Sequence, residues 1–366
     1  MSGPTGLSER ALGPDLARGF MLLFIALANS HYFIAGPAYF SGFPSTGSAV
    51  DRGVGLLIST LVDGRAFPMF GVLFGYGVAQ IVRRQRETGN DWWSIRKLLW
   101  RRSLVLVVLG FLHAMLLYIG DILAAYGVLL FLGVWALRWK DRWLFVVAAL
   151  VLLLTALPSG DTLAGSAEGP DPSRVPATFL GQFADRLTVQ PFIAGLGWIG
   201  FVTPFLIGLW AGRRRILERP VEHIVLLRTT ALLGLTIAIL GPLHDATGVL
   251  GGLGYAALMV LIAHRSGDRP VTRAIAAVGQ RSLTCYLSQS VVWAVVFTPY
   301  LLDLSDTLTT TTTALLAVAT WLATVVLADR MRRTGYRGPF ELLIRRITYQ
   351  PRTTAATRSR NSGSLA

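Results

Sequence analysis

The chain is short of the charged residues that a soluble globular protein carries on its surface. Only 15% of its 366 residues are Asp, Glu, Lys or Arg, 53% are hydrophobic, and the mean hydropathy is +0.54. So few charged side chains leave too little polar surface for a water-soluble fold. The composition therefore predicts an integral membrane protein that has the lipid bilayer as its solvent.

Cysteine is nearly absent as well. Cys285 is the single cysteine, and it lies inside an apolar run. One cysteine excludes an intrachain disulfide, and the sequence contains no Cys/His spacing typical of a metal site. We therefore expect no metal site and no permanently bound cofactor.

Acidic residues are scarce relative to basic ones. The chain has 20 Asp and Glu against 34 Lys and Arg, which gives a net charge of +14. The basic residues form short clusters between apolar runs and do not line one amphipathic surface, so we expect no nucleic-acid partner. We interpret the clusters as topology signals, because Lys and Arg remain on the cytoplasmic side of a membrane.

Ten apolar runs are long enough to cross about 30 Å of hydrocarbon. They lie near 17–38, 65–82, 103–119, 121–138, 142–158, 192–211, 221–241, 249–264, 275–299 and 310–329. The third and fourth runs are short and are separated by little more than Gly120 and Asp121, so this pair is either two spans or a tight, partly re-entrant hairpin. We predict an all-α polytopic bundle of about ten transmembrane helices, within two.

The loops between these runs alternate in charge. Basic residues cluster after the second, fourth, sixth, eighth and tenth runs, at 83–102, 138–142, 213–219, 265–273 and 330–333, whereas 159–190, 242–248 and 300–309 are poor in Lys and Arg. This alternation predicts an even number of spans with both termini in the cytoplasm.

The chain reads as one transmembrane domain, 1–349, followed by a disordered cytoplasmic tail, 350–366, rich in Thr, Arg and Ser. Its longest external loop is 159–190, in which Phe179, Phe183 and Leu187 have the spacing of an interfacial helix, although a plain connector fits equally. Ala26-Leu27-Ala28 has the form of a signal-peptidase site. Because the apolar run continues to Ala38, we expect an uncleaved anchor.

Five local patterns resemble those of the YeiB-like family of bacterial membrane proteins, known as domain of unknown function 418. They are Asp15-Leu16-Ala17-Arg18-Gly19-Phe20 followed by Asn29; Phe70-Gly71-Val72-Leu73-Phe74-Gly75-Tyr76-Gly77; His113 with Gly120-Asp121-Ile122-Leu123-Ala124-Ala125-Tyr126; Val278 through Ser290; and Tyr336-Arg337-Gly338-Pro339-Phe340-Glu341 with Arg345, Arg346, Thr348 and Tyr349. Cys285 and Gln280 depart from the family pattern, which has Asn at the first position and no residue at the second.

The resemblance implies a multi-pass protein of the bacterial inner membrane. The opening helix of the family is in turn distantly similar to membrane acyltransferases of the heparan-glucosaminide N-acetyltransferase and acyltransferase-3 type. That similarity implies transfer of an acyl group from a cytosolic acyl-CoA donor to a hydroxyl or amine acceptor. It is a fold-level analogy, which predicts chemistry only weakly.

Polar groups inside the predicted spans are the candidates for chemistry, because each is costly in hydrocarbon. His113 is the candidate general base, because imidazole titrates near neutral pH, and Asp121 is its candidate orienting group. On a continuous helix the two residues would be roughly 12 Å apart, so a hydrogen bond between them requires the Gly120 turn to fold Asp121 back. A hydrogen-bonded packing histidine is the competing interpretation.

Other candidates are assigned to substrate binding. Asp15 and Arg18 are three residues apart, so they are expected to form an ion pair that either anchors the helix or binds the phosphates of a coenzyme A-like donor. Further candidates for the cavity wall are Asn29, His31, Asp63, Arg65 and Gln289. The spacing of Gly71 and Gly75 predicts a close helix contact.

Three functions remain open from sequence alone. The first is a membrane acyltransferase-like enzyme, and the second is a transporter or exporter of a small or lipidic molecule, in which the same polar residues form a pathway. The third is a non-catalytic scaffold or sensor whose basic loops attract anionic lipids. The lipid bilayer and a small-molecule or lipid substrate are the expected partners, and a homo-oligomer is compatible with the sequence.

Overall fold

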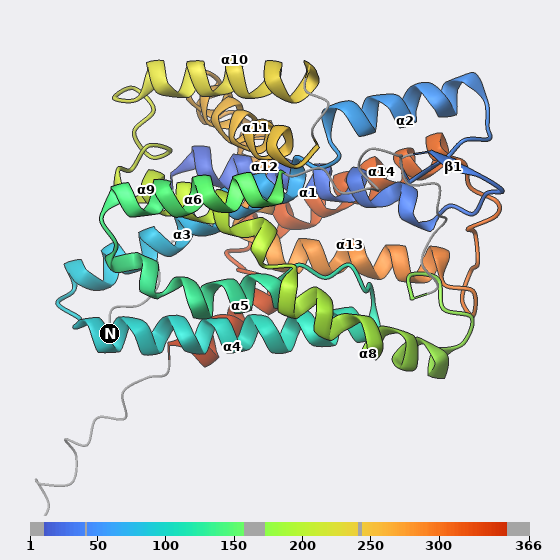
Figure 1. Cartoon of the computed structure of the whole chain (residues 1–366), viewed down its shortest axis with the longest axis horizontal. Coiled ribbons are helices and arrows are strands. Elements are labelled where there is room, and N and C mark those ends of the chain that lie inside the picture. Colours follow the sequence, from blue (N-terminus) through green and yellow to red (C-terminus); the bar gives the residue numbers. More distant parts are fainter. Residues whose placement is uncertain (1–10, 41, 157–172, 241–243, 350–366) are drawn as a thin grey trace, which may run out of the picture.

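The computed structural model shows an all-helical bundle whose helices run along one common direction (Figure 1). It describes residues 11–40, 42–156, 173–240 and 244–349. The predicted tail, 350–366, and the first half of the predicted external loop therefore lie outside the described residues. The strands within the described part are the short pair β1 (Tyr39–Phe40) and β2 (Phe43–Pro44), which are antiparallel.

The helices follow one another with short connections. They are α1 (Leu12–Ser30), α2 (Ala49–Leu61), α3 (Ala66–Glu87), α4 (Trp92–Leu116), α5 (Leu123–Gly133), α6 (Asp141–Thr155), α8 (Phe179–Leu196), α9 (Val202–Arg213), α10 (Ile224–Leu240), α11 (His244–Ser266), α12 (Pro270–Gln280), α13 (Ser282–Phe297), α14 (Thr310–Arg333) and α15 (Pro339–Thr348). Three 3-10 turns, η2 (His31–Phe33), η3 (Trp135–Arg138) and η4 (Ile199–Phe201), join or extend them.

The described part of the chain contains six helical segments that are long and apolar enough to cross a membrane: 12–33, 49–87, 92–116, 179–213, 246–266 and 310–333. Shorter apolar helices lie at 123–133, 224–239 and 282–297. Large apolar side chains such as Leu153, Leu154 and Leu180 are exposed on the outside of the bundle. A bundle that is apolar on its surface is matched to hydrocarbon.

Helix α1 lies at the centre of the bundle, where it packs against α3, α11, α12 and α14. Glycines permit the close approach. A side chain at Gly279 of α12 would clash with the backbone oxygen of Asp15, and one at Gly19 of α1 would clash with that of Ile275. The same applies between α3 and α9, where Gly75 meets Phe205 and Gly208 meets Val72, so the contact predicted for Gly71 and Gly75 is confirmed.

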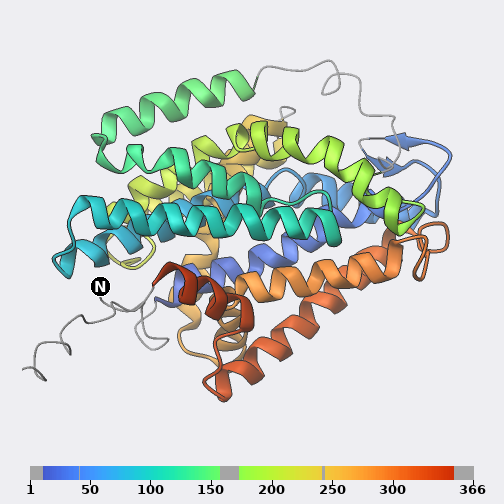
Figure 2. The ribbon, with the colours of Figure 1, turned by 90° about the horizontal axis from the view of Figure 1, so that it is seen from below.

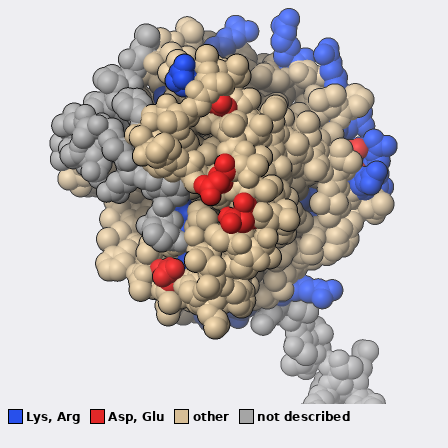
Figure 3. Space-filling view, turned by 90° about the vertical axis from the view of Figure 1, so that its right-hand side faces the viewer, with Lys and Arg blue, Asp and Glu red and all other residues tan. Residues whose placement is uncertain are grey.

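The clusters of basic residues meet at one end of the bundle, on the left in Figure 1, which we call the basic end. Ion pairs join loops that are distant in sequence: Arg83 with Glu218 at 2.7 Å, Arg213 with Asp141 at 2.9 Å and Arg215 with Glu87 at 3.0 Å. The opposite end shows acidic side chains at its centre, and most of the basic side chains in view lie toward its edge (Figure 3).

Several predicted segments differ from the observed helices. Helix α2 was not predicted; it begins with a capping box formed by Ser48 and Asp51 and precedes the second predicted span. The ninth predicted span is divided into α12 and α13 at Arg281. Over the second half of the predicted external loop, 159–190, the helix rather than the plain connector is observed, because α8 begins at Phe179.

Candidate functional site

His113 and Asp121 are hydrogen-bonded, at 2.8 Å between Nδ1 and Oδ1. Helix α4 ends at Leu116, and the following turn carries Asp121 back beside the imidazole, so the two side chains are much closer than on a continuous helix. Oδ2 of Asp121 accepts a hydrogen bond from the backbone amide of Ala124, at the start of α5, at 2.8 Å. Gly110 allows this approach, because a side chain there would overlap Asp121 and Ala124.

The other ring nitrogen of His113 contacts Ser290 of α13, at 2.8 Å between Nε2 and Oγ. Ser290, His113 and Asp121 thus form a buried chain, each side chain being at most 3% exposed. With a proton on Nδ1 facing the carboxylate, Nε2 is the basic nitrogen. This is the connectivity of a hydroxyl, a base and a group that orients the base.

Aromatic side chains fill the space beyond this chain, toward the opposite end. Phe33, Trp293 and Phe297 stack with ring centroids 5.0–5.6 Å apart, and Tyr118 packs on Phe33 at 5.2 Å. The hydroxyl of Tyr118 donates to the side-chain oxygen of Asn29 at 3.3 Å. We call these four rings the aromatic plug.

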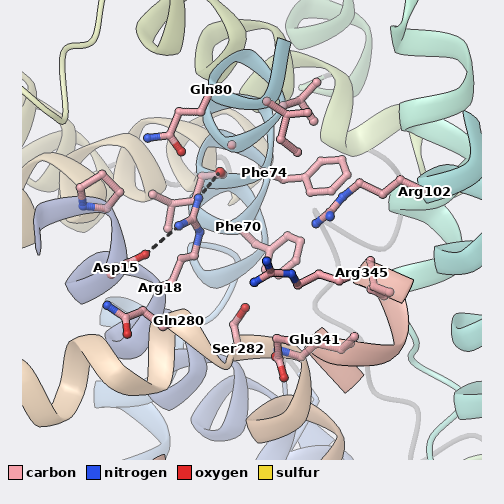
Figure 4. Close-up of a pocket in the computed structure, with 18 of the residues that line it drawn as sticks. Asp15, Arg18, Phe70, Phe74, Gln80, Arg102, Gln280, Ser282, Glu341 and Arg345 are labelled. Atoms are coloured by element: carbon pink, nitrogen blue, oxygen red, sulfur yellow. Dashed lines mark hydrogen bonds and ion pairs between the residues drawn. The ribbon is translucent and has the colours of Figure 1, made fainter. Parts of the chain in front are cut away.

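A cavity of about 890 Å³ opens at the basic end. It is lined by parts of α1, α3, α4, α13 and α15, and Figure 4 shows Arg18, Arg102 and Arg345 pointing toward its interior beside Phe70 and Phe74. Positive charge and exposed aromatic surface are therefore combined in one space. Such a cavity suits a ligand that has an anionic part and an apolar part.

Arg18 and Asp15 line this cavity and form the predicted ion pair, at 3.1 Å. Arg18 also donates to the backbone oxygen of Leu73 on α3 at 3.2 Å. These bonds hold the guanidinium between α1 and α3 and direct it toward the cavity (Figure 4).

Glu218 lies at the cavity wall and is bound by three donors. Arg83 donates to both carboxylate oxygens at 2.7 and 2.8 Å, Gln80 donates at 2.8 Å, and Tyr76 donates at 3.2 Å. Burial alone would raise the pKa of Glu218, but the hydrogen bonds from Gln80 and Arg83 outweigh it and lower that pKa. The charge of Arg83 is thus paired with that of Glu218 within the protein.

Helix α15 closes one side of the cavity and lies across the ends of α4 and α13 (Figure 2). Its Glu341 accepts hydrogen bonds from the backbone amides of Leu283 and Thr284 at 2.9 and 3.0 Å and from the Thr284 hydroxyl. Burial raises the pKa of Glu341. The carboxyl group caps α13 and so fixes α15, with Arg345, over the cavity.

Tyr286 separates the cavity from the buried chain. It lines the cavity, and its ring centroid is 5.0 Å from that of His113. Tyr286 and Ser290 are one turn apart on α13, and the Ser290 Oγ lies 3.2 Å from the Tyr286 backbone oxygen. His113 therefore lies directly behind the inner wall of the cavity.

The other predicted binding residues are not in this cavity. His31 stacks on Phe43 at 4.0 Å, and Arg65 donates to the backbone oxygens of Ser59 at 3.0 Å and Ala238 at 2.6 Å. Asp63 accepts from the amide of Gly64 at 2.9 Å, and Gln289 is buried in α13 with its Nε2 unpaired among the described residues. The outer cavity expected for Asn29, His31, Asp63 and Arg65 stays a prediction; in the structure Asn29 accepts a hydrogen bond from Tyr118.

The sequence reading missed a polar stripe on α8. Gln182, Arg186 and Gln190 are each 1% exposed and repeat every four residues, whereas Phe179 and Leu187 face outward. Arg186 donates to the backbone oxygens of Ser173, Ala114 and Met115, and Gln182 donates to that of Met115. These side chains satisfy the last carbonyls of α4. The sequence signal for this stripe is the four-residue spacing of its three polar side chains, whereas our prediction used only the apolar residues of the same helix.

Among the described residues, no group of three or more His, Cys, Asp or Glu side chains is arranged to hold a metal ion. The chemical groups that the described residues offer at the cavity and the buried chain are therefore their own hydrogen-bond donors and acceptors.

Comparison with known proteins identifies the relatives of the chain. The model of the family described as "Protein of unknown function (DUF418)" matches residues 211–351. The chain is also similar to "Uncharacterized protein YxaH" of Bacillus subtilis (strain 168). The two are 25% identical over an alignment of 388 positions, which covers 94% of this chain and 96% of the relative. These matches confirm the resemblance to the YeiB-like DUF418 family, and neither description names an acyltransferase.

Proposed function

We propose that this protein is a membrane-embedded acyltransferase-like enzyme, oriented with its basic end toward the cytoplasm of a bacterial cell. The observation that carries the proposal is the juxtaposition at Tyr286, which lines the cavity on one side and contacts His113 on the other. A charged cavity and a buried base thus meet at one side chain. Binding and catalytic sites are typically cavities lined by a few convergent polar groups.

The donor is an acyl-CoA, whose shape fits the two kinds of surface in the cavity. Its phosphates are recognised by guanidinium groups, which form strong charge-assisted hydrogen bonds, and Arg18, Arg102 and Arg345 converge from three helices (Figure 4). Its acyl chain lies along Phe70, Phe74 and the neighbouring apolar residues. The thioester then lies toward Tyr286.

His113 acts as the general base. Nε2 takes the proton of an acceptor hydroxyl or amine while the acceptor atom attacks the thioester carbonyl, the C–S bond breaks, and the CoA thiolate leaves with the proton from the imidazole. Asp121, hydrogen-bonded to Nδ1, holds the ring and stabilises its protonated form. Tyr286 turns aside to admit the thioester, and the Ser290 hydroxyl occupies the position of the acceptor until the acceptor binds.

The test combines a binding assay with a turnover assay on detergent-purified protein. Acetyl-CoA and longer acyl-CoAs are expected to raise the melting temperature saturably. Arg18→Ala should weaken this stabilisation, whereas His113→Ala should retain it and lose release of free CoA thiol to a mixed pool of hydroxyl and amine acceptors. Arg273→Ala is the matched control, because Arg273 is exposed and does not line the cavity.

A transporter of a small or lipidic molecule is the second candidate. It is favoured by the buried polar side chains beyond the aromatic plug, above all Arg186 and Gln190 on α8. Transport needs neither acyl-CoA binding nor turnover at His113. If no acyl-CoA stabilises the wild-type protein, the acyltransferase proposal is wrong and transport is preferred.

A further inference from the structure

A cluster of indole rings surrounds one guanidinium on the surface at the basic end. The guanidinium carbon of Arg96 lies 4.1 Å from the ring centroid of Trp93, 4.7 Å from that of Trp100 and 4.9 Å from that of Trp135. Lys97 adds a second cation, 5.0 Å from the Trp93 ring. We call these residues of α4 and η3 the indole cluster.

The charge of Arg96 is not balanced within the described residues. It has no ion pair there, and its Nε is buried without a hydrogen-bond partner. Asp91, at the start of the same helix, is engaged as its cap through the amide of Trp93. Cation–π contacts stabilise a guanidinium but do not neutralise it. The cluster is therefore prepared for an anion.

The same surface continues as an exposed apolar face. Further along α4, Leu104 is 64% exposed and Val108 49%, and Phe131 of the adjacent α5 is 50% exposed. The indole of Trp100 joins the two helices by donating to the backbone oxygen of Phe131 at 3.3 Å. From the end of the bundle inward, the surface thus presents cations set among indoles, and then apolar side chains.

This order matches the parts of a phospholipid. Tryptophan is enriched where headgroups meet acyl chains, and basic side chains near that level attract anionic lipids. We infer that the indole cluster binds one anionic glycerophospholipid, with its phosphate at Arg96 and Lys97 and its acyl chains along Leu104 and Phe131. A soluble anion or a nucleic acid would leave the apolar half of this surface unused. The cluster is separate from the cavity, so the inference is independent of the proposed function.

The experiment titrates detergent-purified full-length protein with phosphatidylglycerol or phosphatidylcholine and measures melting temperature and lipid adducts by native mass spectrometry. The wild-type protein should bind phosphatidylglycerol saturably and in preference to phosphatidylcholine. Arg96→Gln should weaken the phosphatidylglycerol affinity about five-fold, as expected for the loss of one charge near a membrane surface. Arg273→Gln, which removes an exposed charge outside the cluster, should leave the affinity unchanged.

A second variant protects the test against a folding defect. Trp135 is 52% exposed, so Trp135→Leu removes one wall of the cluster without leaving a buried cavity, and it should also weaken phosphatidylglycerol binding. Equal affinities for the two lipids, or an equal loss in Arg96→Gln and Arg273→Gln, would overturn the inference.

Discussion

The arginines at the two ends of the bundle have different kinds of hydrogen-bond partner. At the basic end, arginines such as Arg83 and Arg18 are paired with carboxylates around a cavity of about 890 Å³. Beyond His113, toward the opposite end, Arg186 donates to backbone carbonyls alone among the described residues, and the aromatic plug fills the adjoining space. Under the proposed function, we therefore expect ligands to reach His113 from the basic end, and side chains in the other half of the bundle to act mainly on stability.

The largest expected effect is on turnover at the cavity side. Asp121→Asn keeps the shape of the side chain but removes the charge that stabilises a protonated His113, so we expect acyl transfer to fall by about 100-fold or more. Asn29→Ala, which removes the acceptor of the Tyr118 hydroxyl in the aromatic plug, should lower it far less. Initial rates of CoA thiol release measure both, and equal losses would break the comparison.

The next largest effect is on stability at the opposite side. Arg186→Met removes the guanidinium that donates to the backbone oxygens of Ser173, Ala114 and Met115, of which Met115 keeps its donor Gln182, and we expect a loss of roughly 2–3 kcal/mol. Thermal melting in detergent, with Arg273→Met as the control, measures it. Turnover per folded molecule should be nearly unchanged; a selective loss of turnover would place Arg186 in the reaction.

Binding at the cavity is expected to change more modestly. Arg345 lines the cavity and has no ion pair among the described residues, so Arg345→Ala should weaken acyl-CoA binding roughly ten-fold. Arg346 is the matched control, because it is the next residue of α15, is exposed, and does not line the cavity. Thermal-shift titrations with acyl-CoA measure the affinities of the two variants. Similar affinities would show that Arg345 does not bind the donor.

The smallest expected effect is a pH dependence at Glu218. Its lowered pKa means that the folded protein binds fewer protons than the unfolded chain near the ordinary value of 4.5, so the carboxylate stabilises the fold above pH 4.5 and loses this effect as the pH falls through the folded-state pKa. Glu218→Gln should melt about 2–4 °C lower at pH 7. The difference should narrow in melts at pH 4, and a widening difference would contradict this account.

The membrane class and the local pairs were predictable from sequence. Apolar runs and charged loops depend on composition, and the pair Asp15–Arg18 depends on a spacing of three residues within one helix. The bond between His113 and Asp121 was predictable only as a condition, because it needs α4 to end at Leu116 and the Gly120 turn to reverse the chain. Ser290 was missed because its contact with His113 joins residues 177 positions apart.

The division between α12 and α13 was not predictable for a related reason. The run of 25 residues, 275–299, is interrupted by Gly279, Gln280, Arg281 and Ser282. The break at Arg281 depends on hydrogen bonds from its guanidinium to the backbone of Tyr336, which precedes α15. The stripe on α8 was misread because the spacing of Phe179, Phe183 and Leu187 suggested an apolar face toward protein or headgroups. In lipid the apolar face points outward and the polar face inward.

The central claim, that the cavity next to His113 opens to the cytoplasm, is tested most directly by labelling cysteines from either side of the membrane. Cys285→Ala removes the single native cysteine, and Ser282→Cys then places a thiol in the cavity wall, while Leu301→Cys places one after α13 at the opposite end. A membrane-impermeant thiol reagent should label Ser282→Cys in inside-out vesicles and Leu301→Cys in right-side-out vesicles, and acyl-CoA should protect the former. Labelling of Ser282→Cys in right-side-out vesicles would contradict the account.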